Sequence, residues 1–85
     1  MIWITAANYL KEFKVSVTFN SGESYIIDLK DELTGEIFAP LKDLQIFSAV
    51  KFEPELDTIV WDNGADFAPE FLYELGRKQK DNRSA

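Results

Sequence analysis

The residues best suited to chemistry lie between Trp61 and Tyr73, in the stretch WDNGADFAPEFLY. Asp62, Asn63 and Asp66 offer side-chain oxygens, the ligands that hard cations such as Ca²⁺ take in proteins. A calcium-binding loop that began at Asp62 would need a bidentate glutamate at its twelfth position, and that position holds Tyr73. The spacing therefore does not match a calcium loop, and a cation-sensing or small-molecule-sensing domain is the second interpretation of this stretch.

The same stretch has the features of a corner between a strand and a helix. Asn63 and Gly64 suit a turn that needs positive φ, and Pro69 suits the first position of a helix. Asp66 precedes that helix closely enough to accept hydrogen bonds from its first N–H groups. We therefore interpret the motif as structural first, with any binding role second; its members are Trp61, Asp62, Asn63, Gly64, Asp66, Pro69 and Tyr73.

Catalysis is disfavoured by the residue types that the chain lacks. It contains no histidine and no cysteine, so the commonest general base, the commonest metal ligand and the thiolate nucleophile are all missing. The serine and threonine hydroxyls have no histidine to activate them, and the glycines are isolated rather than grouped in a phosphate-binding loop. We expect no enzymatic activity, no cofactor and no bound metal.

Charge is unevenly distributed along the chain. The formal net charge is −6, but segment 77–85 holds four basic residues and one acidic residue, so residues 1–76 carry −9. A body this acidic repels phosphate backbones, which disfavours direct nucleic-acid binding by the folded part. It favours a basic protein as partner.

The sequence also bears on location. No stretch is apolar over the roughly 18 residues that a membrane-spanning helix needs. The first residues lack the basic start of a signal peptide, and the absence of cysteine is typical of a reducing compartment. We expect a cytoplasmic protein with no membrane association.

The strongest secondary-structure signal is a hairpin over residues 13–29. Apolar and polar residues alternate through FKVSVTF and again through ESYIIDL, as in strands with one buried face. A three-residue loop, Asn20–Gly22, keeps both apolar sets on the same face and places Val17 opposite Tyr25. The sequence therefore predicts a defined register for this hairpin.

Three further segments surround the hairpin. Residues 2–10 are β-rich and predict an N-terminal strand. Residues 49–61 predict a second hairpin, in which Pro54 suits the second position of the turn. Between the hairpins, DLQIFSAV predicts a short helix with Asp43 as its N-cap.

The C-terminal segment predicts an amphipathic helix from Pro69 to about Lys78. Its apolar side holds Phe67, Phe71, Leu72 and Leu75. Residues 79–85 predict a frayed basic tail. The expected fold is α+β: an antiparallel sheet of two hairpins plus an N-terminal strand, packed against one C-terminal helix, with a short helix in the middle and a single domain over residues 1–78.

The two tryptophans receive different interpretations. Trp61 ends a predicted strand beside the helix, and we expect it in the core because a small domain needs large aromatic side chains to fill its interior. Trp3 alternates with Ile2 and Ile4, so burial of those isoleucines would leave it partly exposed. Trp3 is therefore a candidate interface residue, for a partner protein or for a second copy in a homodimer.

The order of motifs resembles a known family. The segments VTFNSGE, YIIDL, GEIFAPLKDLQIF, VKFEPELDTIVW and NGADFAPEFLYE follow one another along the chain. This order, and above all W-x-NGAD-x-AP-x-x-LY, is similar to the bacterial and archaeal family called domain of unknown function 2442. The resemblance implies a small α+β domain without an established activity.

The resemblance also implies which other domains and proteins occur together with such domains. Some members resemble the N-terminal half of proteins with a helix-turn-helix domain, and the chain to Ala85 leaves no room for one, so we carry over no DNA-reading role. Others occur beside a second small protein, in arrangements suggestive of toxin–antitoxin pairs. The first hypothesis is therefore a non-enzymatic protein-interaction module, most concretely an antitoxin-like partner of a small basic protein. The alternative is a regulatory domain that senses a small molecule or cation, with Asp62, Asn63 and Asp66 facing a pocket.

Overall fold

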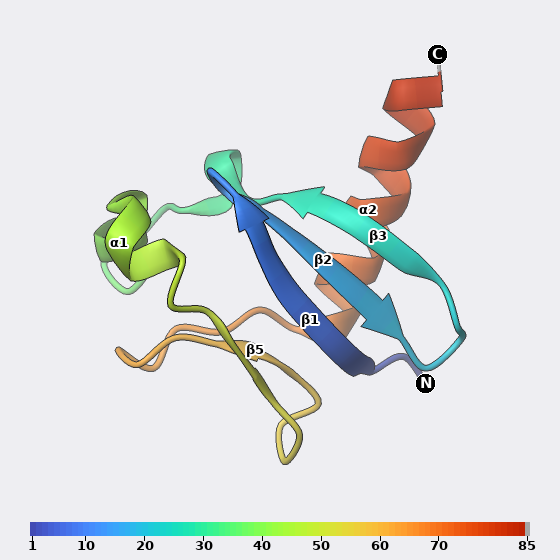
Figure 1. The fold of residues 1–85 in the computed structure, drawn as a ribbon, viewed down its shortest axis with the longest axis horizontal. Coiled ribbons are helices and arrows are strands. Elements are labelled where there is room, and N and C mark those ends of the chain that lie inside the picture. The colour runs from blue at the N-terminus through green and yellow to red at the C-terminus, as the bar shows by residue number, and fades with distance from the viewer. Residues whose placement is uncertain (85) are drawn as a thin grey trace.

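The computed structural model describes residues 1–84, with side chains described up to residue 81. In chain order its elements are β1 (Ile4–Lys11), β2 (Lys14–Phe19), β3 (Ser24–Asp28), 3-10 turns at Lys30–Glu32 and Ala39–Lys42, α1 (Leu44–Phe47), β4 (Lys51–Glu53), β5 (Thr58–Val60) and α2 (Pro69–Ser84). One antiparallel sheet has the order β1-β2-β3, and β4 pairs with β5 in a second sheet. α2 lies behind the three-stranded sheet in Figure 1, while α1 and the β4–β5 hairpin lie on the side of β1. The predicted α+β class and the C-terminal helix are confirmed.

The β2–β3 hairpin has the predicted register. Val17 pairs with Tyr25, and the Phe19 N–H donates to the Glu23 C=O at 2.9 Å across the three-residue loop. Gly22 in that loop has φ of 90°, a conformation that glycine adopts at no steric cost. As a result the alternate apolar residues of both strands share one face and are buried; they are Val15, Val17, Phe19, Tyr25 and Ile27.

The β4–β5 hairpin forms as predicted but does not extend the first sheet. The Leu56 N–H donates to the Glu53 C=O at 3.1 Å, which puts Pro54 at the second position of the turn. Beside it, the Ile4 N–H of β1 donates to the Asp57 C=O at 2.9 Å. The pairing of β1 with β2 shifts register next to Ile4, and such a bulge bends a strand away from regular pairing. The bond from Ile4 does not continue into a ladder, so the strands form sheets of three and two rather than one continuous sheet.

α2 extends beyond its predicted end near Lys78 and continues to Ser84. The side chain of Gln79 is bound to the backbone of Asp28 in β3: its Oε1 accepts from the Asp28 N–H, and its Nε2 donates to the Asp28 C=O, both at 2.8 Å. This contact holds the C-terminal half of the helix against the sheet. Residues 79–84 of the predicted tail thus belong to α2, and Ala85 lies outside the described residues.

The buried face of α2 differs from the predicted one at Phe71. Leu72 is fully buried and Leu75 is half-buried, but Phe71 is 41% exposed. Leu72 and Leu75 share the side that faces the sheet with Gly76, at the spacing of one helix face. Phe71 is rotated away from that side and stacks on Phe67, with ring centroids 5.5 Å apart.

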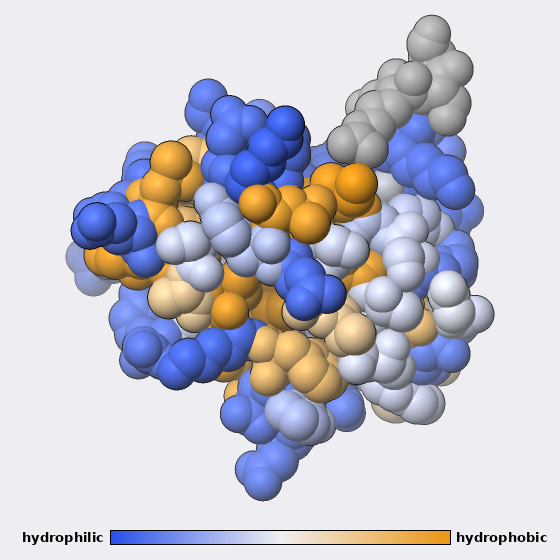
Figure 2. Space-filling view, in the orientation of Figure 1, coloured by the Kyte–Doolittle hydropathy of each residue, from blue (hydrophilic) through white to orange (hydrophobic). Residues whose placement is uncertain are grey.

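The short middle helix is a single turn. The Asp43 side chain accepts a hydrogen bond from the Gln45 N–H at 2.9 Å, which confirms the predicted N-cap. Phe47 is fully buried, whereas Leu44 and Ile46 are exposed. Figure 2 accordingly shows hydrophobic surface over α1.

Candidate functional site

The motif from Trp61 onward forms a closed loop between β5 and α2. The Trp61 N–H donates to the Ala65 C=O at 2.9 Å, and the Gly64 N–H donates to the Trp61 C=O at 3.0 Å. Gly64 has φ of 91°, so the loop uses glycine where the backbone requires a left-handed residue. Val60 then bridges to Asp66, which closes the strand–turn–helix corner that the sequence indicates.

Asn63 connects this loop to the middle of the chain. Its Oδ1 accepts a hydrogen bond from the Ala65 N–H at 3.0 Å, and its Nδ2 donates to the Ile37 C=O at 2.8 Å. One side chain thus stabilises the turn and ties it to a segment 26 residues away in sequence. The Asn63 oxygen is used in folding rather than presented to a ligand.

The two aspartates of the motif do not converge with Asn63 on one site. Asp62 is exposed and pairs with Lys51, with an Oδ1–Nζ distance of 2.7 Å. Asp66 does not cap α2 as predicted, because its bridge to Val60 holds it in extended backbone before the helix. Its exposed side chain bonds none of the side chains described up to residue 81 and no backbone group of residues 1–84. Within those residues, no three of His, Cys, Asp and Glu gather closely enough to hold a metal ion.

Replacing Asn63 is therefore expected to cost more stability than replacing either aspartate. Asn63→Ala removes two hydrogen bonds and should lower the free energy of unfolding by about 1–2 kcal/mol. Asp66→Ala and Asp62→Ala should each change it by less than about 0.5 kcal/mol, since both side chains are at the surface and an exposed ion pair contributes little. Urea unfolding followed by circular dichroism measures all three variants. A larger loss for Asp66→Ala than for Asn63→Ala would restore the capping role.

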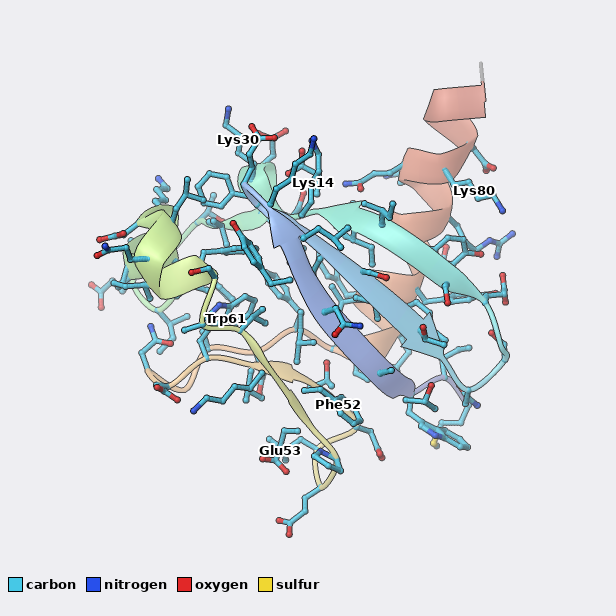
Figure 3. The ribbon with its side chains drawn as sticks, viewed as in Figure 1. Lys14, Lys30, Phe52, Glu53, Trp61 and Lys80 are labelled. Atoms are coloured by element: carbon cyan, nitrogen blue, oxygen red, sulfur yellow. The ribbon has the colours of Figure 1, made fainter. Side chains whose placement is uncertain are left out.

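Trp61 lies in the core, as its aromatic bulk suggests. The residue is 3% exposed, and its indole Nε1 donates to the Phe47 C=O of α1 at 2.9 Å (Figure 3). Its ring packs against Phe47 and Phe67, with centroids 5.5 and 5.9 Å away. Trp61 therefore joins α1 to the corner and is not available to a ligand.

An aromatic stack leads from this core to the surface. Phe38 stacks on Phe67 with ring centroids 4.7 Å apart and an interplanar angle of 21°, and Phe67 stacks in turn on Phe71 at 5.5 Å. Phe71 and Ile37 are exposed. We call this surface the corner patch: its apolar members are Ile37, Phe38, Phe67 and Phe71, and the exposed carboxylates next to them in the sequence are Glu36, Asp66 and Glu70.

Tyr73, the last residue of the motif, belongs to a second cluster that the sequence does not reveal. Its hydroxyl donates to Glu23 Oε1 at 2.8 Å, and the Tyr25 hydroxyl donates to Glu23 Oε2. The rings of Tyr25, Tyr73 and Phe19 pack edge to face or tilted, with centroids 5.2 to 6.0 Å apart. We call Glu23 with these two tyrosines the Glu23 cluster; it joins β3 to α2.

The hydrogen bonds of the Glu23 cluster shift the pKa of each member. The Tyr25 and Tyr73 hydroxyls, together with the Arg77 charge, hold the pKa of Glu23 below its ordinary value of 4.5. The same carboxylate raises the pKa of Tyr25 to about 12 and raises that of Tyr73. The folded state therefore favours an ionised Glu23 with both tyrosines neutral.

Comparison with known proteins identifies the family. The family model described as "Protein of unknown function (DUF2442)" matches residues 4–78. The chain belongs to this family. The match includes the corner patch and the Glu23 cluster, whereas Trp3 and Gln79 lie just outside it. No curated protein matches the chain.

The DUF2442 fold is also present in a solved structure. The chain is similar to a crystal structure described as a "putative DNA binding protein" from Nitrosomonas europaea, with a TM-score of 0.82 and 23% sequence identity. The similarity covers 95% of this chain and 52% of that one, so the chain spans about half the length of that protein. At this identity the likeness shows the fold alone. In residues 1–84 of this DUF2442 protein, no helix has the length and apolar character to cross a membrane.

Trp3 is partly exposed, as its alternation with Ile2 and Ile4 predicts. Ile4 is 1% exposed and Ile2 is partly buried, while Trp3 is 40% exposed. The backbone of Trp3 is held by Asn20, whose Oδ1 accepts from the Trp3 N–H at 2.9 Å. Its role in an interface stays a prediction.

The Glu23 cluster predicts how stability depends on pH. Because the pKa of Glu23 is lowered by folding, its contribution is present above the ordinary value of 4.5 and is lost as the pH falls below it. The tyrosines behave oppositely: their contribution is present below pH 10 and is lost as the pH rises toward the Tyr25 pKa of about 12. Glu23→Gln should weaken both dependences. Melting temperatures from pH 2 to pH 11 test this, with Glu36→Gln as the exposed control; identical profiles for the two variants would contradict it.

Proposed function

We propose that this DUF2442 protein is a cytoplasmic, non-enzymatic protein-interaction module that binds a small basic protein, in the manner of an antitoxin. The observation that carries the proposal is the corner patch, where an aromatic stack reaches the surface beside exposed carboxylates. Protein interfaces combine an apolar, often aromatic centre with a polar rim. The corner patch has that composition, and Phe71 is its exposed anchor.

The charge of the surface supports a basic partner. Residues 1–76 carry −9, and three exposed carboxylates are next in the sequence to apolar members of the corner patch. Opposite charge on a partner speeds its approach and disfavours wrong partners, while the buried aromatic centre supplies affinity. Binding should therefore weaken, without disappearing, as salt concentration rises.

The two other functional classes have less support. The structural neighbour is described as a "putative DNA binding protein", but this chain spans about half of that protein, and its acidic body repels phosphate. The cation-sensing alternative depends on Asp62, Asn63 and Asp66, yet the Asn63 oxygen accepts from the Ala65 N–H and Asp62 pairs with Lys51.

The test is co-purification of the full chain with the products of adjacent genes. A basic partner should remain bound at physiological salt, and Phe71→Ala should weaken its binding by tenfold or more, about 1.4 kcal/mol. Leu56→Ala is the matched control, because Leu56 is also exposed but lies in the β4–β5 turn, away from the corner patch. Leu56→Ala should melt like the wild type, and Phe71→Ala should lower the melting temperature only slightly, because Phe71 stacks on Phe67 but is 41% exposed.

Two results would overturn the proposal. One is purification of the chain alone under these conditions. The other is a partner whose affinity falls equally with Phe71→Ala and Leu56→Ala, because that partner would not use the corner patch.

A further inference from the structure

β3 is an edge strand whose outward backbone groups can be assigned from its pairing. The Phe19 N–H donates to the Glu23 C=O, and the Leu29 N–H donates to the Phe13 C=O, each at 2.9 Å. Residues with inward and outward hydrogen-bonding groups alternate in an antiparallel ladder. The odd-numbered residues of β3 therefore bond to β2, and the N–H and C=O groups of Ser24, Ile26 and Asp28 point away from the sheet.

Gln79 occupies one end of this edge. Its side-chain amide accepts from the Asp28 N–H and donates to the Asp28 C=O, so it takes the place that a peptide group of a neighbouring strand would fill. Among residues 1–84, no group bonds the outward backbone N–H and C=O of Ser24 and Ile26. The edge is thus closed at Asp28 and open at the two preceding outward positions.

A hollow lies beside the open part of the edge. It has a volume of about 200 Å³ and is lined by Ser24, Tyr25, Ile26, Gly76 and Lys80. α2 passes behind β3 and continues beyond its outer edge in Figure 1, and Figure 3 shows Lys80 on that part of the helix. A strand added to β3 would therefore have the C-terminal half of α2 behind it.

The charges near the hollow indicate which side chains a bound segment would carry. The Lys80 ammonium lies 5.7 Å from the centre of the Tyr25 ring, and the Arg77 guanidinium lies 5.6 Å from that of Tyr73. Lys80 lines the hollow, so its charge favours a negatively charged side chain there, whereas Arg77 lies close enough to the Glu23 carboxylate to lower its pKa. We propose that the groove between the outer edge of β3 and the C-terminal half of α2 binds an extended, acidic segment of a partner protein, which adds a fourth strand to the sheet.

Two other occupants fit less well. A second copy paired edge to edge would bring its own α2 into the layer that the first α2 already occupies behind and beyond β3. Nucleic acid would be attracted by the cations but would leave the outward N–H and C=O pairs of the edge without their natural complement, another peptide backbone. The groove differs from the corner patch, since it lies along β3 and the C-terminal half of α2, whereas the patch uses the first turn of α2 and the loops beside it, and the two surfaces favour opposite charges.

The direct test titrates the ¹⁵N-labelled full chain with a synthetic eight-residue peptide that alternates glutamate and valine. We expect the Ser24 and Ile26 amides to shift and to gain protection from hydrogen exchange. The same peptide with every second peptide nitrogen methylated should not bind, because methylation removes donors from one edge. A lysine–valine peptide should bind at least about fivefold more weakly, as should the acidic peptide at high salt.

Matched variants distinguish peptide binding at the edge of β3 from a general effect of the protein's charge. Lys80→Glu should weaken peptide binding about tenfold, whereas Lys78→Glu, an identical charge change at an exposed position outside the hollow, should weaken it less. Ile26→Pro removes one outward N–H without removing a bond to β2, so the fold should persist and binding should be lost.

Several results would overturn this inference. They are no binding at millimolar peptide, equal binding of the lysine–valine peptide, or shifts confined to residues away from β3 and α2. Tighter binding of duplex DNA at the same amides would assign the groove to nucleic acid instead. Concentration-dependent dimers that protect Ser24 and Ile26 without peptide would assign it to a second copy.

Discussion

Trp61→Ala is expected to lower the free energy of unfolding by about 3–5 kcal/mol, a large share of the total stability of a small domain. Trp61 is 3% exposed, and its ring fills the space between Phe47 and Phe67. Alanine would leave a cavity there and would also remove the indole donor from the buried Phe47 C=O. The loss should appear as a large decrease in the urea midpoint, followed by far-ultraviolet circular dichroism because the variant removes a fluorophore.

Two further variants separate the causes of this loss. Trp61→Phe retains most of the aromatic volume but not the hydrogen bond, so it should cost about 1–3 kcal/mol. Trp3→Ala removes the other tryptophan, which is 40% exposed, and should cost less than about 1 kcal/mol. Equal midpoints for Trp61→Ala and Trp3→Ala would show that Trp61 does not hold the corner to α1.

Local patterns of the sequence predict the parts of the fold that depend on near neighbours. Alternation in two adjacent segments determines the β2–β3 register, because a slip of one residue would expose every buried side chain. The Asp43 cap and the Pro54 turn are likewise set within four residues. Structure that depends on residues this close in sequence, such as caps and turns, can be predicted from residue type alone.

Contacts between distant segments explain what the sequence does not reveal. Glu23 meets Tyr73 across 50 residues, and Gln79 meets Asp28 across 51, so no periodicity marks either contact. The second contact lies in the segment predicted as a tail, whose residues 79–84 belong to α2. In the motif, residue type alone favours Asp66 as the helix cap, but the bridge to Val60 removes it from that position, and Asn63 makes the stabilising bonds instead. The sequence therefore locates the corner correctly and assigns the wrong side chain to it.

At Gly76, helix propensity and side-chain packing predict opposite effects of a substitution on stability. Glycine lowers helix stability by about 1 kcal/mol relative to alanine, so propensity alone predicts that Gly76→Ala stabilises the protein. However, a Cβ built at Gly76 would lie 2.9 Å from Cβ, Cγ and Cδ2 of Tyr25. Tyr25 cannot move aside easily, because its hydroxyl is bound to Glu23 and its ring packs against Phe19 and Tyr73.

Gly76→Val is therefore expected to destabilise the protein by about 3 kcal/mol, the upper end of the cost of overpacking. Gly76→Ala should destabilise it by about 1–2 kcal/mol, since the gain in helix propensity offsets part of the clash. Both variants should push α2 away from β3, so hydrogen exchange should also increase at the Asp28 amide that Gln79 binds. Lys78→Ala, at an exposed position of the same helix, should leave stability and exchange unchanged. Stabilisation by Gly76→Ala would show that the helix does not approach Tyr25 this closely, and the groove beside β3 would lose the wall that α2 provides.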